Sequence, residues 1–99
     1  MAEKLQFHPQ VADDLRAAIA WYHGISSSLG DRFRIAVEQR VDSVVAFPES
    51  FGVVFQNARA ARLSGFPYLL LFEYGVGVVY VLGVFHSASN PAKWRGRSG

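Results

Sequence analysis

The hydrophobic period of the sequence changes at Pro48, and this change restricts the fold more than any other feature. Before Pro48, apolar residues recur every three or four positions, which is the spacing of one face of an α-helix. After Pro48, they fill short runs separated by glycine, proline and asparagine, which is typical of β-strands. The chain therefore divides into a helical half and a strand half.

The helical half predicts two amphipathic helices. The first begins near Pro9, which suits the first turn of a helix because its missing N–H needs no partner there, and it ends at Gly24. A turn over residues 25–28 follows, and Ser28 with Asp31 resembles a capping box that starts the second helix. Because the connection is short, the two helices should pack as an antiparallel hairpin. Their apolar stripes are Val11, Leu15, Ala18, Ile19 and Tyr22 in the first helix, and Leu29, Phe33, Val37, Val41, Val44 and Val45 in the second.

Strands are expected on both sides of the helices. One opens the chain around Leu5 and Phe7, and the last two, at 67–74 and 78–86, are apolar on both faces and should lie in the middle of a sheet. The expected fold is α+β: an N-terminal strand, then a helical hairpin packed on a three- to four-stranded antiparallel sheet. A doubly wound sheet is excluded because only one strand precedes the helices. The remaining short strands are expected at 53–55 and 59–63, and a tight turn at 75–77.

Length and composition indicate one domain over residues 1–99. Hydrophobic residues make up 51% of the chain, which is enough for a single core. Cysteine is absent, so disulfides and thiolate metal sites are excluded. The first ten residues lack the apolar region of a signal peptide, and the longest apolar run, 76–85, is too short for a membrane-spanning helix. These features favour a cytoplasmic protein without a membrane partner.

Positive charge concentrates in the strand half. Residues 1–50 carry five basic and seven acidic side chains, a net charge of −2, whereas residues 51–99 carry five basic and one acidic, a net charge of +4. This asymmetry points to an anionic partner for the second half. The alternative is a solvated surface that ends in a frayed basic tail at residues 92–99.

Several kinds of catalytic and cofactor site are missing from the sequence. The three histidines, His8, His23 and His86, share no metal-ligand spacing. Neither a glycine-rich phosphate loop nor a nucleophile elbow is present. We therefore expect no metal, no cofactor and no covalent nucleophile.

Candidate functional residues remain in the basic half. Metal-free cleavage of RNA needs a base for the 2′-hydroxyl, an acid for the leaving oxygen and cations around the phosphorane. If the C-terminal segment folds back over the sheet, imidazole, guanidinium and ammonium groups can converge on one phosphodiester. The candidates are Arg59, Arg62 and His86 for catalysis, and Lys93, Trp94 and Arg95 for binding of nucleic acid or of another target.

Each candidate also has a structural interpretation. His86 ends a strand and can be a half-buried histidine that holds the following loop. Arg59 and Arg62 can decorate a strand or pair with carboxylates of the helices. Trp94 can be a lid that packs on the core rather than a platform for stacked bases. The sequence leaves both sets of interpretations open.

Four segments, taken in order, carry a resemblance to a known family. The first two are FHPQVADDLRAAIAWY, for a strand and a helix, and LGDRFRIAVEQRVDSVVAFPESF, for a second helix with a proline exit. The next two are ARLSGFPYLLLFEY, for the entry to a hairpin, and VLGVFHSASNPAKW, for a last strand and its histidine. Their order across nearly the whole chain resembles the RelE/ParE superfamily of toxins from type II toxin–antitoxin systems, often called plasmid stabilisation proteins.

The resemblance implies a small α+β toxin and a cognate antitoxin. The tail of the antitoxin folds on the toxin, and its other part binds DNA. The toxin then contacts DNA only indirectly, through the antitoxin. RelE-like members cut messenger RNA at the ribosome, whereas ParE-like members inhibit DNA gyrase. Arg59, Arg62 and His86 fall where the superfamily has functional or family-typical residues. At Ala88 and Ser89 the chain departs from many relatives, which carry arginine there, and the C-terminal tyrosine of RelE-like members has no match.

Three functions are compatible with these features. The leading hypothesis is a toxin that binds its antitoxin and inhibits a target such as DNA gyrase, because the loss of two arginines weakens the stabilisation of a phosphorane. The first alternative is a metal-independent, ribosome-dependent mRNA endonuclease that uses Arg59, Arg62 and His86. The second is an attenuated member that only forms the antitoxin complex.

Overall fold

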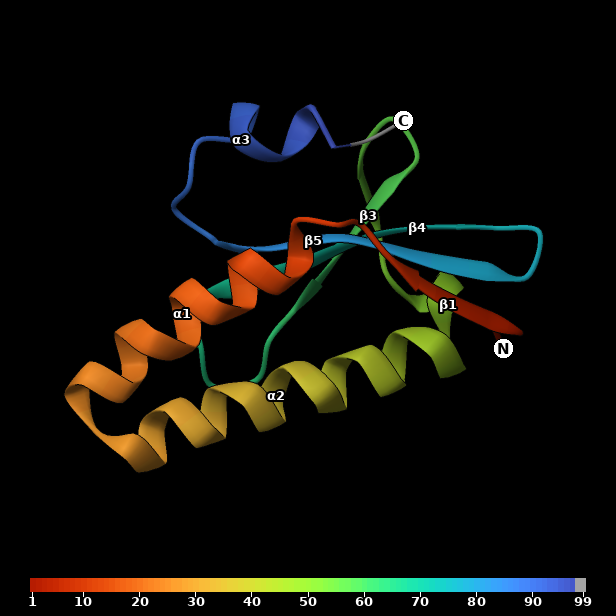
Figure 1. The fold of residues 1–99 in the computed structure, drawn as a ribbon. Helices are drawn as coiled ribbons and strands as arrows, with labels where there is room; N and C mark the ends of the chain where they lie inside the picture. The colour runs from red at the N-terminus through yellow and green to blue at the C-terminus, as the bar shows by residue number, and fades with distance from the viewer. Residues whose placement is uncertain (98–99) are drawn as a thin grey trace.

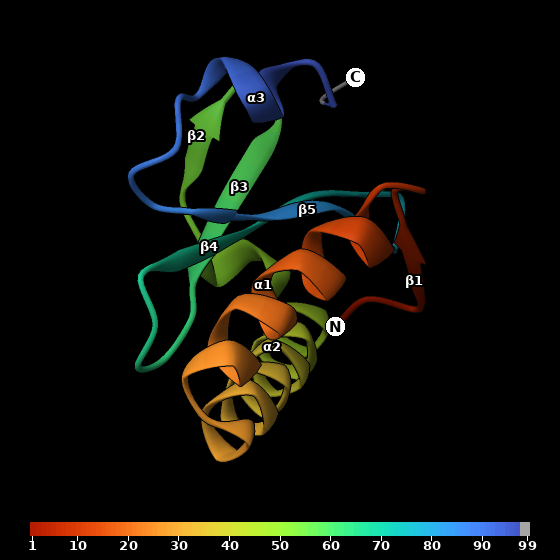
Figure 2. The same cartoon turned by 60° about the vertical axis from the view of Figure 1, so that its left-hand side comes forward.

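The structure is a computed structural model that describes residues 1–97. Two long helices cover one face of a sheet, and a short C-terminal helix lies on the other face (Figures 1 and 2). This arrangement confirms the predicted α+β fold, with one strand before the helical hairpin and the other strands after it. The elements are β1 (Lys4–Phe7), α1 (Val11–Ile25), α2 (Ser27–Ala46), the 3-10 helix η1 (Pro48–Ser50), β2 (Val53–Phe55), β3 (Ala58–Arg62), β4 (Tyr68–Gly75), β5 (Val78–His86) and α3 (Ala92–Arg95).

The sheet is larger than predicted and is mixed rather than antiparallel. Its five strands have the order β1-β5-β4-β3-β2. The opening strand joins as an edge strand: β1 runs parallel to β5, from the pair Lys4–Val78 to the pair Phe7–Val81, and all other neighbours are antiparallel. The parallel orientation is possible because the whole helical hairpin serves as part of the long connection between β1 and the sheet. The prediction that β4 and β5 are central strands is confirmed.

The connection between the helices is shorter than predicted. Ser26 alone separates α1 from α2: its extended backbone (φ −159°) ends α1 with a bond from its N–H to the carbonyl of Tyr22, and its hydroxyl accepts the N–H of Leu29. Ser26 is therefore the N-cap, and the capping box predicted at Ser28 is wrong. The helix start predicted at Pro9 is also too early, since α1 begins at Val11.

Two cores hold the layers together. The larger lies between the sheet and the helical hairpin, and it includes the fully buried Phe33 of α2 and Phe72 of β4. The smaller lies on the opposite face, where Leu71, Leu82 and Phe85 pack with Ala58. Because both faces of the central strands are covered, the apolar runs of the strand half are buried on both sides.

The C-terminal segment is folded onto the smaller core. Residues Ala92–Arg95 form α3, and Trp94 packs against that core and lies edge-on to Phe55, with ring centroids 6.1 Å apart. This geometry confirms the lid interpretation of Trp94, and a frayed tail over residues 92–97 is wrong. Residues 98 and 99 of the expected tail lie outside the described residues. Within residues 1–97, no helix has both the length and the apolar character that a membrane span requires.

Candidate functional site

The structure does not bring the six candidate residues together. On β3, Arg59 lies opposite Phe72 of the larger core, whereas Arg62 lies opposite Leu69 and points to the other face. Two residues that are three positions apart in a regular strand must point to opposite faces, because side chains alternate. Arg59 donates from Nη1 to the carbonyl oxygen of Phe51 at 2.7 Å. Arg59 therefore holds the segment after α2 and does not share a surface with Arg62.

Two of the C-terminal candidates, Trp94 and Arg95, contact the ring of Phe55. The guanidinium of Arg95 lies over the ring of Phe55 at 4.9 Å, next to the edge-on contact of Trp94 with the same ring. A cation above an aromatic face is attracted by the ring quadrupole. Arg95 and Trp94 thus attach α3 to β2, and they are less available to an external ligand than the sequence suggested.

His86 and Lys93 both line an open cleft of about 600 Å³, which we call the α1–β5 cleft. Arg59, Arg62, Trp94 and Arg95 do not line it. The cleft lies between α1, the end of β5 and the C-terminal segment. Its lining residues are Asp14, Ala17, Ala18, Trp21, Tyr68, Val84, Phe85, His86, Ser89, Lys93 and Arg97.

One ring nitrogen of His86 forms a hydrogen bond with the loop that follows β5. This nitrogen, Nδ1, accepts the backbone N–H of Ala88 at 3.0 Å. A neutral imidazole that accepts at Nδ1 carries its proton on Nε2, so its outer nitrogen is a donor. In this state His86 can donate a hydrogen bond from Nε2 into the cleft but cannot take a proton there.

Tyr68 is a site residue that the sequence reasoning did not select. It pairs with His86 across β4 and β5, and the two rings meet edge to face with centroids 5.2 Å apart. Burial raises the pKa of Tyr68 above its ordinary value, and the neighbouring Tyr22 raises it further. The phenol therefore stays protonated and can act only as a neutral donor or acceptor near neutral pH.

The raised pKa of Tyr68 predicts a loss of stability at alkaline pH. As the pH rises past 10.0, the unfolded chain releases this proton while the folded chain keeps it, so the free energy of unfolding should fall. Tyr68→Phe removes the titrating group and should make this fall shallower. Urea unfolding at neutral pH and above pH 10 measures the difference. Equal alkaline losses in wild type and Tyr68→Phe would contradict the assignment.

A buried ion pair closes the side of the cleft. Arg97 donates to Asp14 from Nη1 at 2.5 Å and from Nη2 at 3.0 Å, and the two side chains are only 14% and 12% exposed. The pair also covers the edge of β5 beyond the end of β1. The N–H of Val84 donates to Asp14 and Arg97 donates to the carbonyl of Leu82, both at 3.2 Å. A Cβ at Gly83 would lie 2.5 Å from Arg97 Nη1 and 2.8 Å from Asp14 Oδ2, so a larger residue there would displace the side chains of the ion pair.

The ion pair makes the charge of Arg97 unavailable to a ligand in the α1–β5 cleft. The charge of Arg97 is neutralised by Asp14, and its guanidinium also lies over the ring of Phe85 at 4.6 Å. Lys93 makes no ion pair within residues 1–97, so it is the free ammonium of the cleft. Among the same residues, no group of three or more His, Cys, Asp or Glu side chains could hold a metal.

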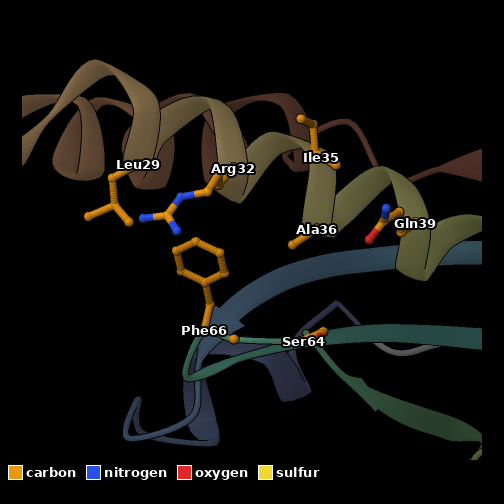
Figure 3. Close-up of a pocket in the computed structure, with 8 residues that line it drawn as sticks. Leu29, Arg32, Ile35, Ala36, Gln39, Ser64 and Phe66 are labelled. Atoms are coloured by element: carbon orange, nitrogen blue, oxygen red, sulfur yellow. The ribbon is translucent and has the colours of Figure 1, made fainter.

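A second surface lies along α2, in a groove of about 280 Å³ that we call the α2 groove. In Figure 3, Leu29 and Arg32 extend from the helix toward Phe66, and Ser64 lies opposite Ala36 and Gln39. Ile35, which is 44% exposed, belongs to the same lining. The groove thus combines apolar side chains with one cation and two polar groups.

Comparison with known families decides the assignment. Residues 5–91 match the family model described as ParE toxin of type II toxin-antitoxin system, parDE. The chain belongs to the ParE toxin family. The match covers most of the sequence, and it confirms the RelE/ParE resemblance seen in the four segments. No curated protein matches the sequence.

Solved structures agree with the fold of the ParE toxin family. The structure is similar to one described as the chromosomal ParDE TA system from P. aeruginosa, with a TM-score of 0.63 and 17% identity over 84% of this chain and 94% of that chain. It is also similar to the isolated E. coli RelE toxin, with a TM-score of 0.61 and 16% identity over 93% of this chain and 92% of that chain. These likenesses support the shared fold and not a particular target.

Proposed function

We propose that this ParE-family chain is a cytoplasmic toxin that acts by binding a protein target, DNA gyrase, and is neutralised by a cognate antitoxin. The observation that carries the proposal is the separation of its cationic side chains. Arg59 holds Phe51 on the helix face, Arg62 points to the other face, and Arg97 is paired with Asp14. A toxin that acts by binding a protein does not need several cations gathered around one phosphate group.

The same separation weighs against cleavage of RNA. A metal-free mechanism needs a base, an acid and several cations around one phosphate. Among residues 1–97, the α1–β5 cleft offers Lys93 as a cation outside any ion pair, and Ala88 and Ser89 add no charge. His86 accepts the N–H of Ala88 and therefore cannot serve as the base. These contacts favour inhibition by binding.

We assign the antitoxin to the α2 groove. A helical or extended segment with an apolar side could pack on Ile35 and Phe66, and an acidic residue next to that side could meet Arg32. Arg32 carries the positive charge in the lining of this groove, which suits an acidic segment of the partner. Contact of this toxin with DNA would then occur only through the antitoxin.

Messenger RNA cleavage at the ribosome is the second candidate function, and one observation favours it. Tyr68, His86 and Lys93 all line the α1–β5 cleft, and the phenol and the imidazole can both donate there. Nuclease activity would have to rely on these three groups and on charges supplied by the ribosome.

Controlled expression separates the candidates. Induction of the chain should arrest growth and induce the DNA-damage response, and co-expression of the neighbouring antitoxin gene should restore growth. Arrest with messenger RNA cut at ribosomal positions would support the nuclease, and no arrest would support an attenuated member.

His86→Ala provides the residue-level prediction. It should keep growth arrest while it lowers the free energy of unfolding by about 1–2 kcal/mol, since Ala88 loses its acceptor. If His86 is instead a catalytic acid, the variant should lose about 10²–10⁴-fold in cleavage rate and with it the arrest. Antitoxin binding, measured by calorimetry on the purified chains, is the control for folding.

A further inference from the structure

The turn between β4 and β5 has an unusual residue at its tip. Gly75 pairs with Val78, so the turn consists of two residues, Val76 and Gly77, with φ angles of +53° and +74°. Positive φ at both positions defines a type I′ turn, in which asparagine followed by glycine is preferred. A β-branched residue is a genuine outlier in this conformation, because its branched side chain crowds the backbone.

Packing of the Val76 side chain does not compensate for this strain. The side chain of Val76 is completely exposed, with a relative accessibility of 103%. In Figure 1 the turn lies at one end of the molecule, far from α3 and from the junction of α1 with α2. At the neighbouring turn between β2 and β3, the residue with positive φ is the polar Gln56. Strained residues cluster at functional sites, so the exposed valine is a candidate for a binding role.

Further apolar side chains lie next to Val76. A depression of about 400 Å³ begins at Val76 and is lined by Val53, Val78 and Tyr80 among others. Val53 is 54% exposed and lies on the edge strand β2. We call Val76, Val53, Val78 and Tyr80 the hairpin patch.

Charge near the hairpin patch indicates the class of partner. Residues 75–78 carry no charge, and the depression contains one basic and one acidic side chain, Arg59 and Glu73. A surface that binds nucleic acid needs an excess of cations to neutralise phosphates. An apolar centre with a mixed polar rim is instead the composition of a protein interface.

We propose that the hairpin patch is the surface with which this toxin contacts its protein target, and that Val76 inserts into an apolar recess of that target. The inference rests on the proposed function, because it needs a toxin that acts by binding a protein. It places the target at the opposite end of the sheet from the α1–β5 cleft. The antitoxin in the α2 groove would then bind a different surface.

The test is Val76→Asn, for which stability and toxicity should move in opposite directions. Asparagine suits the type I′ turn, so the unfolding midpoint should rise by about 4 °C or more, given the shift expected for a domain of this size. The level of protein needed for growth arrest should rise about tenfold, as for loss of a central interface residue. Affinity for the antitoxin should stay the same.

Two matched variants make the result specific. Val76→Ile keeps a β-branched apolar side chain and should keep both the strain and the toxicity. Ile25→Asn places the same new residue at another exposed apolar position, 64% exposed at the end of α1, and should leave toxicity unchanged.

The outcomes distinguish this inference from the function on which it rests. If Val76→Asn is more stable and fully toxic, the hairpin patch is not the target surface, and the proposed function stands. If Val76→Asn loses affinity for the antitoxin, the patch binds the antitoxin and the inference is overturned. If the wild-type chain causes no arrest, the proposed function and this inference both fail.

Discussion

Phe33→Ala should lower the free energy of unfolding by about 3–5 kcal/mol, the usual cost of removing a buried aromatic side chain. Phe33 is 0% exposed and lies where the helical hairpin meets the sheet. Its ring contacts those of Tyr22, Phe66 and Tyr68, with centroid distances of 5.2, 5.1 and 4.9 Å. The substitution therefore leaves a cavity between α1, α2 and the sheet at once.

For a chain of this size, such a loss is a large part of the total stability, which is about 5–15 kcal/mol. The matched control is Phe47→Ala, because Phe47 is 67% exposed and the same atoms are removed from water-accessible surface. Its cost should stay within about 0.5 kcal/mol. Urea unfolding of both variants measures the contrast, and equal losses would mean that the aromatic cluster does not join the layers.

Asp14→Asn should have the second-largest effect, a loss of about 3 kcal/mol in the free energy of unfolding. The amide leaves Arg97 charged and nearly buried without a counter-ion, and it weakens the bond to the N–H of Val84. The C-terminal segment should then detach from the edge of β5. Limited proteolysis should cut this segment faster than in the wild type.

Asp13→Asn is the control for the ion pair. Asp13 pairs with Arg16 at 2.6 Å, but both side chains are more than two thirds exposed, at 76% and 73%. Exposed pairs contribute little, so the loss should be at most about 1 kcal/mol. A coupling energy between Asp14→Asn and Arg97→Gln in a double-mutant cycle isolates the buried contact. Equal losses for the Asp13 and Asp14 variants would contradict this account of the C-terminal segment.

Local patterns predicted the elements well, because each depends on neighbours in the sequence. The period near 3.6 identified both helices, and the doubly apolar runs identified β4 and β5 as central strands. The place of β1 was not predictable in this way. Its partner β5 is more than 70 residues away, and nothing local to Lys4–Phe7 specifies a parallel pairing at the sheet edge. The ion pair of Asp14 with Arg97 was not predictable for the same reason, because the two residues are 83 positions apart in the sequence.

Two predictions about the candidate site failed: Arg59 and Arg62 were grouped on one surface, and Tyr68 was not selected. The sequence alone could have corrected the first but not the second. The spacing of Arg59 and Arg62 already requires opposite faces in a regular strand. The pairing of Tyr68 with His86 depends instead on a bulge between Leu71 and Phe72 that shifts the register by one residue. Counted back from the turn without the bulge, Tyr68 would face Phe85.

Inhibition of DNA gyrase by the purified chain tests the central claim most directly. In a supercoiling assay, the chain should block gyrase in proportion to its concentration, and added antitoxin should restore the activity. His86→Ala should inhibit as the wild type does. Unimpaired supercoiling, together with cleavage of messenger RNA on ribosomes by the same preparation, would contradict the claim that this ParE-family toxin acts by binding a protein.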